Sequence, residues 1–576
     1  MKRSSLVLLP LLVVLIAVLM LGSADAQYKG TAAKKTVEKA VDVTTCYGCH
    51  DPIKTLHTMG KHAKVNCVNC HSGIAKHLEN PGPDTRPVTD TSWEACGACH
   101  KDQYNSFMQT AYNVRPARDE KSQLTGRSPN PFWDKIMAGH GFTKEHNATR
   151  SHVNMLPDHL IVDRAYGGRF QAKNGWEYIF EKGKAWDILT DTHHETKEHK
   201  AFIPQSAAAA NPVCLQCKSQ DQILKWSYMG DKIEGKTTWD RTSNVVELAQ
   251  DLNHGLNCFY CHDPHAAKPR IVRDGLIQAL TRPEADTLWA KDPKHTNFQV
   301  IDMGLRGFKR KIAILDKYDT RLQCGQCHVE YNCNPGYDPT NPDTSAYTIK
   351  MGSQLTNHFP YKDVFGLYDH YKNQVKFLDF KHALTGGLIW KAQHPESETF
   401  YNSKHAKAGA GCDSCHTPKM KDPKTGKIWT SHFAVTPRVQ LKQTCLTAKC
   451  HPSWTEEQAK YAIDSVKAHI RGKLRKAEFW LVALIDKIVA AKAAGVDPEV
   501  IKQAQDQHLK AHVLWEYWTA ENSDGFHNPE MARESLTRSV DESTKGIKII
   551  NDAMAPKTAS AAPAPAAAPA AAPAAK

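Results

Sequence analysis

The sequence predicts a mainly α-helical protein with short helices and loops over most of its length and long helices near its C-terminus. Up to about residue 454, Gly, Pro and Asn interrupt the chain often, and few runs alternate between apolar and polar residues. Long strands are therefore not expected there. After Thr455, apolar residues recur instead at helical spacing.

The N-terminus has the pattern of a secretory signal. Lys2 and Arg3 precede an apolar run over residues 6–21, and the site Ala24-Asp25-Ala26 follows it. We expect a signal peptide at residues 1–26 and a mature protein in the periplasm. An uncleaved anchor is the alternative, because the run is almost long enough to cross a bilayer.

Paired cysteines organise the middle of the chain. Six CxxCH motifs are present, the pattern of c-type haem attachment, in which two thiols bond the haem edge and the histidine supplies an axial iron ligand. Zinc sites also use cysteine pairs but do not require the histidine that follows each pair here. The six motifs are Cys46, Cys49 and His50; Cys67, Cys70 and His71; Cys96, Cys99 and His100; Cys258, Cys261 and His262; Cys324, Cys327 and His328; and Cys412, Cys415 and His416.

Two further motifs vary the pattern. Cys214 and Cys217 are followed by Lys218 in place of histidine, and Cys445, Cys450 and His451 enclose four residues instead of two. Eight motifs of two cysteines use sixteen of the seventeen cysteines and leave Cys333. The predicted fold is therefore a multihaem cytochrome c, with short helices and loops around a covalent haem array. A core filled largely by porphyrin agrees with a hydrophobic fraction of only 41%.

Motif spacing predicts the domains. Three motifs lie within residues 46–100, none within 101–213, and five within 214–451. We expect an N-terminal three-haem domain over residues 27–159 and a five-haem domain over residues 160–454.

A haem with two histidine ligands has no open coordination position and carries only electrons. Seven such haems need seven distal histidines, and the chain has 30 histidines in total. The candidates near the motifs are His57, His62, His265, His405, His432 and His527, with His140, His152, His159 and His382 as further possibilities.

Lys218 indicates a different kind of haem. An amine binds iron only when it is deprotonated, and metal binding itself drives off the proton. Such a ligand is not needed for a relay, so we expect the opposite face of this haem to be open to substrate. A degenerate motif without a special role is the alternative.

Three long helices are expected after the last motif. Thr455 begins the first, whose Leu481, Leu484, Ile485 and Ile488 form one apolar stripe and which stops near Gly495. A second runs from Asp497 and Pro498 to about Thr519, and a third from Pro529 to Asn551. Residues 455–554 form this region, either packed within the chain or at a subunit interface. The Ala- and Pro-rich tail, residues 555–576, is expected to be disordered.

The net charge of +13 does not indicate a nucleic-acid partner, because the carboxylates of eight haems offset much of it. A local positive funnel for a small anion is compatible with this charge.

Four stretches of the chain resemble the cytochrome c nitrite reductase family: residues 324–331, residues 391–396, the lysine-ligated motif, and residues 522–529. The resemblance covers roughly residues 160–554. The three additional N-terminal motifs, together with Tyr331 and Cys333, resemble the octahaem nitrite reductases. This resemblance implies eight covalent haems, one of them lysine-ligated, and six-electron reduction of nitrite to ammonium.

The resemblance also implies roles for individual residues. It makes Lys218 the proximal ligand, places Tyr331 and His394 on the open face, and implies a covalent bond between Tyr331 and Cys333. A lone reduced thiol at Cys333 is the alternative. The family arginine before the lysine motif is missing here, which points upstream to Arg164 in preference to Arg169. A Ca²⁺ ion is implied, with the Glu330 and Gln393 side chains and the carbonyls of Tyr331 and Lys391 as ligands.

The implied partners are nitrite or another small nitrogen or sulfur oxyanion and a quinol-linked or small cytochrome donor, in a homo-oligomer. Hydroxylamine and sulfite are further expected substrates. Two other functions remain open at this point. One is an octahaem tetrathionate reductase or a hydroxylamine or hydrazine oxidoreductase, and the other is a non-catalytic electron conduit.

Overall fold

The computed structural model describes residues 38–109, 131–140, 151–156, 170–172, 189–191, 212–236, 238–244, 247–248, 251–252, 255–305 and 307–555. The predicted signal peptide, Arg164, Arg169, His159 and residues 556–576 of the predicted tail lie outside these residues. Among the described residues, no helix is both long enough and apolar enough to cross a membrane.

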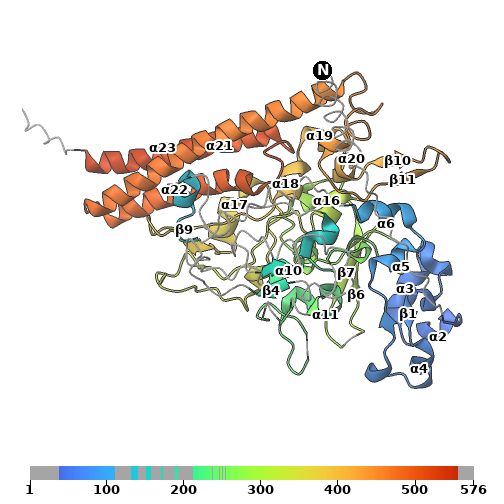
Figure 1. The fold of residues 1–576 in the computed structure, drawn as a ribbon. Helices are drawn as coiled ribbons and strands as arrows, with labels where there is room; N and C mark the ends of the chain where they lie inside the picture. The colour runs from blue at the N-terminus through green and yellow to red at the C-terminus, as the bar shows by residue number, and fades with distance from the viewer. Residues whose placement is uncertain are drawn as a thin grey trace, which may run out of the picture.

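The N-terminal segment consists of short elements beside the central region (Figure 1). It contains α2 (Val43–Tyr47), α3 (Asp51–Thr58), α4 (Ile74–Glu79), α5 (Trp93–Gly97), α6 (Lys101–Phe107), the 3-10 helices η1 (Lys61–Lys64), η2 (Cys67–Asn69) and η3 (Pro83–Thr85), and the strands β1 (His71–Ser72) and β2 (Val88–Thr89). Trp93 donates its indole N–H to the carbonyl of Leu256 at 2.9 Å, and Asn257 donates to the carbonyl of Thr91 at 2.8 Å. These bonds fix the segment to the motif at Cys258.

The first half of the central region begins with α8 (Pro131–Ile136), η5 (His152–Asn154), β3 (Phe170–Ala172), β4 (Leu189–Asp191), α10 (Pro212–Leu215), α11 (Gln222–Lys225) and η8 (Tyr228–Gly230). It continues with α13 (Cys258–Cys261), β5 (Arg270–Ile271), α14 (Asp274–Thr281), α15 (Leu288–Lys291), β6 (Phe298–Asp302) and β7 (Lys311–Leu315). Strand β7 pairs with both β5 and β6 in an antiparallel sheet. Ile312 and Ile314 of β7 are buried, so this small sheet supports the motif that follows it.

The second half contains α16 (Thr320–Cys324), η9 (Gln354–Asn357), α17 (Val364–Asp369), the π-helical turn η10 (His370–Gln374), β8 (Phe380–Lys381), β9 (Leu388–Ile389) and α18 (Glu396–Tyr401). It ends with α19 (Lys404–Lys407), α20 (Cys412–His416), the hairpin of β10 (Lys419–Lys421) and β11 (Ile428–Thr430), and η11 (Pro437–Val439). The strands of the described residues are short and the helices predominate. The predicted mainly α fold is confirmed.

The three C-terminal helices are α21 (Glu456–Ala493), α22 (Pro498–Ala520) and α23 (Pro529–Met554), and they pack side by side (Figure 1). Thr455 and Gln458 form a capping box at the start of α21. Asp497 caps α22, with Pro498 in its first turn. Gly495 has a φ of 70°, a left-handed conformation that glycine adopts without strain. It lies just after the end of α21, where the chain turns toward α22. The predicted boundaries are confirmed to within a few residues.

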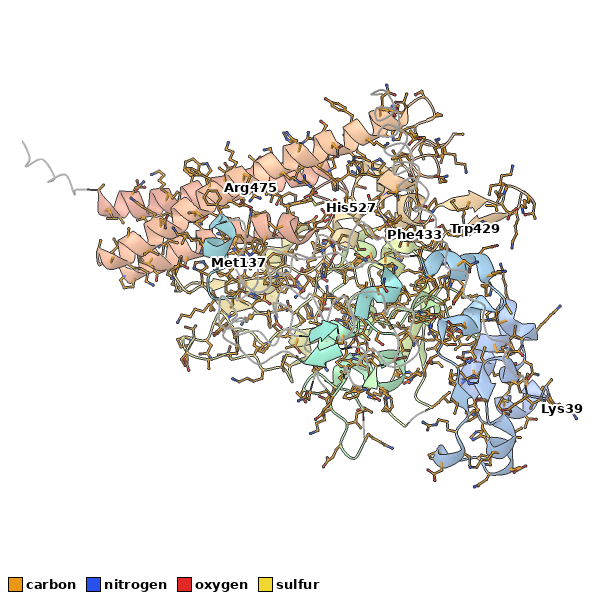
Figure 2. The ribbon with its side chains drawn as sticks, in the orientation of Figure 1. Lys39, Met137, Trp429, Phe433, Arg475 and His527 are labelled. Atoms are coloured by element: carbon orange, nitrogen blue, oxygen red, sulfur yellow. The ribbon has the colours of Figure 1, made fainter. Side chains whose placement is uncertain are left out.

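The apolar faces of these helices are buried inside the chain. Leu481, Leu484, Ile485 and Ile488 of α21 have no exposed surface. Trp515 of α22 is also fully buried and lies against Trp133 of α8, with ring centres 5.5 Å apart. The side chains drawn in Figure 2 show Met137, just after α8, below the bundle. Intramolecular packing is therefore one use of this apolar surface.

Candidate active site

Each attachment motif folds as a tight helical turn. The backbone N–H of His50 donates to the carbonyl of Cys46 at 3.1 Å, and the same bond joins His100 to Cys96 and His328 to Cys324 at 2.9 Å. In the motif with four intervening residues, the N–H of His451 still reaches the carbonyl of Cys445, at 3.0 Å. The longer loop thus ends in the same hydrogen bond as the shorter ones.

Five motif histidines face a second histidine at nearly constant separation. The ring centres are 6.1 Å apart for His100 and His62, and 6.2 to 6.4 Å apart for the pairs His50 and His77, His71 and His265, His262 and His432, and His416 and His527. A metal ion held between two imidazole nitrogens at about 2 Å from each separates the ring centres by roughly 6 Å. The described residues therefore fit iron atoms between paired histidines.

Hydrogen bonds select the ring nitrogen in these pairs. The Nδ1 atoms of His62, His416 and His432 lie 2.6 to 3.0 Å from backbone carbonyl oxygens. Because Nδ1 is occupied, Nε2 is the nitrogen available to a metal.

Of the six histidines proposed from sequence as distal ligands, four occupy these pairs: His62, His265, His432 and His527. Burial and then the neighbouring His451 lower the pKa of His405, which lies near the motif at Cys445. The sixth candidate, His57, requires a correction.

The structure places His57 away from a haem-ligand position. Its Nδ1 lies 2.5 Å from the hydroxyl of Tyr47, and its Nε2 lies 2.9 Å from the carbonyl of Val65. Both nitrogens are used within the protein, and His77 faces His50 instead. Likewise, His382 uses Nε2 on the carbonyl of Lys135 and Nδ1 on the N–H of Thr385.

His152, one of the further possibilities, lies near the motif at His328. Burial and then His328 lower the pKa of His152 to about 4. This neighbour could not be identified by proximity in the sequence, because 176 positions and two other attachment motifs separate His152 from His328.

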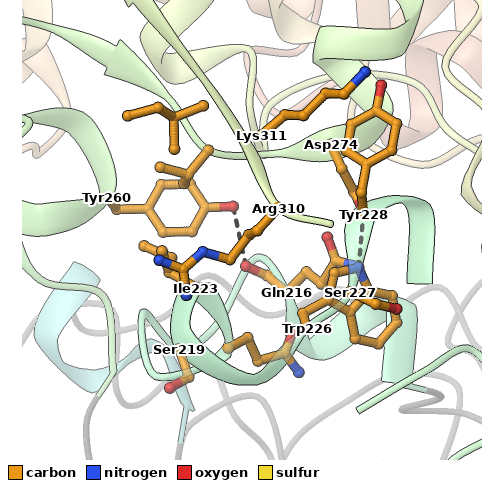
Figure 3. Close-up of a pocket in the computed structure, with 13 residues that line it drawn as sticks. Gln216, Ser219, Ile223, Trp226, Ser227, Tyr228, Tyr260, Asp274, Arg310 and Lys311 are labelled. Atoms are coloured by element: carbon orange, nitrogen blue, oxygen red, sulfur yellow. Dashed lines mark hydrogen bonds between the residues drawn. The ribbon is translucent and has the colours of Figure 1, made fainter. Parts of the chain in front are cut away.

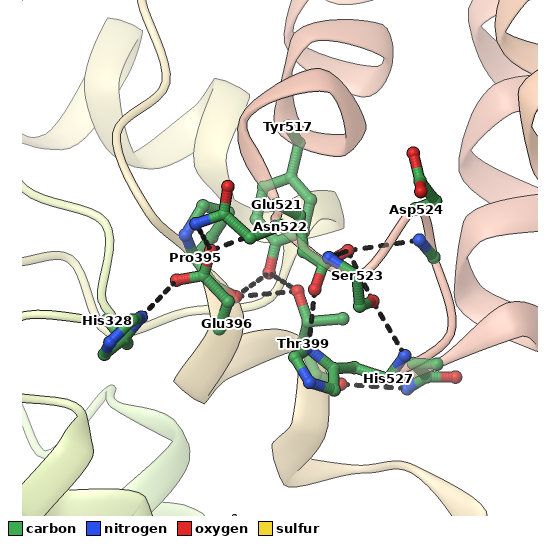
Figure 4. Close-up of polar contacts among 12 residues, drawn as sticks. His328, Pro395, Glu396, Thr399, Tyr517, Glu521, Asn522, Ser523, Asp524 and His527 are labelled. Atoms are coloured by element: carbon green, nitrogen blue, oxygen red, sulfur yellow. Dashed lines mark hydrogen bonds and ion pairs between the residues drawn. The ribbon is translucent and has the colours of Figure 1, made fainter. Parts of the chain in front are cut away.

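Two carboxylates orient histidines beside the bundle (Figure 4). Glu396 of α18 accepts from Nδ1 of His328 at 3.3 Å, and its other oxygen accepts from the side chain of Asn522 at 2.7 Å. Glu521 lies 2.5 Å from Nδ1 of His527. Sequence reasoning assigned neither glutamate a role, although both lie within the stretches that carried the resemblance or directly beside them.

Lys218 follows the short helix α10, and its backbone N–H donates to the carbonyl of Leu215 at 2.9 Å. Its side chain is buried. Tyr331, also buried, stacks on Phe359 with ring centres 5.4 Å apart. Burial, followed by the Cys217 and Cys214 sulfurs, raises the pKa of Tyr331 well above its usual value. The structure thus brings Tyr331 to the lysine-ended motif, as the resemblance implied.

Cys333 and His394 lie on the segments that flank Tyr331. The Gln393 side-chain amide is 2.9 Å from the sulfur of Cys333. The hydrogen bond with Cys214, and then burial, raise the pKa of the Cys333 thiol well above its usual value. His394 is half-buried, and its carbonyl accepts from the N–H of Glu396 at 2.9 Å. Gln393 therefore joins the predicted active-site segment to the odd cysteine.

Buried carboxylates gather behind these segments. Burial raises the pKa values of Glu330 and Glu398 well above their usual range and that of Asp379 to about 7. Lys391 is the positive charge that acts on both Glu330 and Asp379. If all three ionise, these carboxylates outnumber the positive charge of Lys391, and a bound cation would favour their ionised form. Glu330 accepts from Tyr371 at 3.2 Å and from the N–H of Gln393 at 2.6 Å.

Within the described ranges, no group of three or more His, Cys, Asp or Glu side chains is arranged to hold a metal ion. The ligand set implied for calcium includes only one such side chain, Glu330, together with an amide and two carbonyl oxygens. Such a set, built from hard oxygen donors, suits Ca²⁺.

A small pocket lies behind the lysine-ended motif (Figure 3). Gln216, inside the motif, accepts from the hydroxyl of Tyr260 at 3.0 Å through its carbonyl. Trp226 donates to Asp274 at 2.8 Å on the other side of this pocket. Arg310 and Lys311 supply positive charge to its lining.

Comparisons with known proteins show which family and which fold the chain resembles. The family model described as cytochrome c552 matches residues 172–576. The chain is 27% identical over 447 residues to cytochrome c nitrite reductase subunit NrfA of Nitratidesulfovibrio vulgaris, covering 74% of this chain and 70% of the relative. It is 23% identical over 505 residues to cytochrome c-552 of Haemophilus influenzae, covering 85% and 80%.

A solved structure of cytochrome c nitrite reductase NrfA from Desulfovibrio desulfuricans, described with two calcium sites, has the same fold. The TM-score is 0.55 at 22% sequence identity, over 80% of this chain and 86% of that one.

Proposed function

We propose that this chain, which belongs to the cytochrome c552 family, catalyses the six-electron reduction of nitrite to ammonium. The observation that carries the proposal is Lys218, which is buried where every other attachment motif has a histidine. The two cysteines of this motif, Cys214 and Cys217, lie near buried Tyr331. The names of the relatives support nitrite as the substrate.

A haem attached to Cys214 and Cys217 would supply electrons and a coordination position for nitrite. Lys218 would hold this haem as an iron ligand. Tyr331 and His394 lie on the substrate side in our proposal, where the hydroxyl donates a hydrogen bond and the imidazole donates charge and protons. The conversion of nitrite to ammonium and two waters consumes eight protons, so proton donors are required at this position.

We assign Arg164 as a further cation for the anion, as implied by the resemblance, and a covalent bond between Tyr331 and Cys333. The 2.9 Å contact of Gln393 with the sulfur of Cys333 keeps this thiol at the site. Glu330 and Gln393, with the carbonyls of Tyr331 and Lys391, would hold Ca²⁺. The buried carboxylates around Glu330 support this assignment.

Seven further haems would carry electrons to this centre. The five facing histidine pairs support two-histidine ligation for five of them. We assign His152 opposite His328 and His405 opposite His451 for the other two, from their electrostatic proximity. Glu396 and Glu521 would fix the ring orientation of His328 and His527.

The predicted signal peptide places the enzyme in the periplasm, with electrons supplied by a quinol-linked or small cytochrome donor. By analogy with multihaem relatives, we propose a homo-oligomer. Hydroxylamine and sulfite are candidate secondary substrates, because each can bind the same open iron position.

The test is anaerobic turnover of nitrite by the purified holoprotein with a reduced viologen dye. We expect one ammonium for every six electrons. The substitution Lys218→His restores a CxxCH motif, so haem attachment is retained and turnover falls at least tenfold. Lys449→Ala, which alters a lysine inside the longer motif, is the matched control and leaves the rate unchanged.

Two outcomes would replace this function with another. No nitrite turnover by protein with its full haem content, combined with tetrathionate reduction, identifies the alternative enzyme. No turnover of either substrate, with a spectrum that lacks any high-spin haem, identifies an electron conduit.

A further inference from the structure

Arg273 is a buried cation beside the lysine-ended motif. Its side chain has no exposed surface, and its Nε, Nη1 and Nη2 atoms have no hydrogen-bond partner among the described residues. A buried charge without partners is costly, because the protein interior does not replace the hydration that the ion loses.

The neighbouring Arg270 has a guanidinium whose hydrogen-bond donors do have partners. Arg270 is also buried, but it bonds the carboxylate of Asp263 at 2.8 Å and donates from Nε to the carbonyl of Phe259 at 2.9 Å. Two arginines three residues apart are thus both buried, yet among the described residues only Arg270 has hydrogen-bond partners.

The carboxylate that follows Arg273 in the chain is already used. Asp274 lies 4.0 Å from Nη1, beyond hydrogen-bond distance. One Asp274 oxygen accepts from Trp226 at 2.8 Å, and the other accepts from Asn357 at 3.0 Å. Asp274 also lines the pocket behind the motif (Figure 3).

The guanidinium of Arg273 lies instead near Tyr331, the tyrosine expected on the substrate side of the haem. Its central carbon is 5.3 Å from the ring centre of Tyr331 and 5.2 Å from that of Phe359. Its charge and that of Lys218 both act on the sulfur of Cys217. Arg273 is therefore positioned at the haem that Cys214 and Cys217 would attach.

We propose that Arg273 binds an anion with two oxygen atoms in the pocket of the Lys218-ligated haem. The planar guanidinium fork matches the spacing of two oxygens in a carboxylate or in nitrite. Two sources share this chemistry: a carboxylate of the haem itself, and the substrate anion. This inference rests on the proposed function for the identity of the substrate, but not for the presence of the haem.

The experiment compares the wild-type holoprotein with Arg273→Gln and Arg273→Lys. The reduction potential of the high-spin haem is measured by spectroelectrochemical titration from pH 6 to pH 8, and the nitrite dissociation constant is measured from the change in the haem spectrum. The control is Arg241→Gln, because Arg241 is buried but already paired with Asp231 and with the carbonyl of Gly352.

A haem carboxylate as the anion gives one pattern of results. In Arg273→Gln the carboxylate loses its neutralising charge, so the potential falls and declines further as the pH rises and the carboxylate ionises. The nitrite dissociation constant then changes less than threefold. Nitrite as the anion gives the reverse: a dissociation constant at least tenfold weaker, with the potential and its pH dependence unchanged.

Arg273→Lys retains the charge but not the fork, so we expect a smaller effect in the same direction. It replaces Arg273→Gln in both measurements if the latter fails to retain haem. Unchanged potential and unchanged nitrite affinity, in a variant with full haem content, would overturn the proposal. A shifted potential in a protein whose wild type does not reduce nitrite would support the anion site while rejecting the proposed function.

Discussion

Residues 38–109 and residues 455–555 differ in what lies inside them. The buried apolar side chains of the N-terminal segment are Leu56, Val68, Ile74, Tyr104 and Met108, and they are spread over short helices. Helix α22 alone buries more apolar side chains than this, including Trp515 and Trp518. The N-terminal segment carries three of the haem motifs, whereas the C-terminal helices carry none. One region requires a bound group to complete its interior, and the other has an ordinary protein core.

The largest test of this difference removes the haems from the N-terminal segment. We replace the three cysteine pairs in its motifs with serine, and expect residues 38–109 to become sensitive to protease because their own apolar core is too small. The rest of the chain should keep five haems. Limited proteolysis with mass spectrometry measures both results, and Val88→Ser, at a position 68% exposed, is the control. A protease-resistant haem-free segment would remove the contrast between the two regions.

The next test removes packing from the helices. Trp515→Ala deletes a fully buried side chain that lies against Trp133, so we expect a loss of about 3–5 kcal/mol in the free energy of unfolding. Phe479→Ala, on the exposed side of α21, should cost less than about 0.5 kcal/mol. Thermal unfolding followed by circular dichroism gives both values. Loss of haem from Trp515→Ala would show that the two regions do not have separate sources of stability.

A polar contact joins the bundle to the central region and should depend on pH. Asp506 of α22 accepts from the hydroxyl of Tyr368 at 2.5 Å and also pairs with Lys372 and, at 3.0 Å, with Lys510. Burial raises the pKa of Asp506, but the bonds from Lys372 and Tyr368 lower it more, so that its pKa lies below its usual value. Its stabilisation is therefore present above about pH 4 and lost as the pH falls through the lower folded-state pKa.

We expect Asp506→Asn to lower the free energy of unfolding at pH 7 by about 1.5–3 kcal/mol. The difference from wild type should shrink as the pH falls below about 4. Denaturant unfolding at several pH values measures this change. Asp552→Asn, in an exposed pair with Lys548, is the control and should change stability by less than about 0.5 kcal/mol. An equal loss at pH 3 and pH 7 would contradict the assigned ionisation.

The smallest effect separates a ligand from a structural histidine within the N-terminal segment. His77→Ala should convert one haem from low to high spin without loss of haem, because His77 faces His50. His57→Ala should leave every spin state unchanged and cost about 1 kcal/mol, from the bonds to Tyr47 and Val65. Electron paramagnetic resonance of the oxidised proteins distinguishes them. A new high-spin signal in His57→Ala would reverse the assignment.

Local signals in the sequence were sufficient to predict where the C-terminal helices begin and end. Thr455 and Gln458 cap α21, and Asp497 with Pro498 begins α22, because each cap is made within one turn of the helix it starts. The motif residues were predictable for the same reason, since each attachment site is one short stretch.

Long-range neighbours could not be predicted in this way. His77 faces His50, and His265 faces His71 across the boundary between the N-terminal segment and the central region. Which histidine completes a pair depends on packing between segments, and nothing near a motif specifies it. The partners of Arg270, and the lack of hydrogen-bond partners for Arg273 within the described ranges, depend in the same way on how distant segments pack.

Helix α18 has a consequence for how the chain length can vary. Residues 393–399 are seven consecutive positions that contain Gln393 and His394, Glu396, which contacts His328, and Thr399, which contacts the hydroxyl of Tyr517 at 3.0 Å. One inserted residue turns the rest of a helix by about 100°, so it would separate these contacts from one another. Insertions and deletions should therefore be absent from this stretch in functional variants. The exposed turn between β10 and β11, around Gly426, has no such constraint and can change length freely.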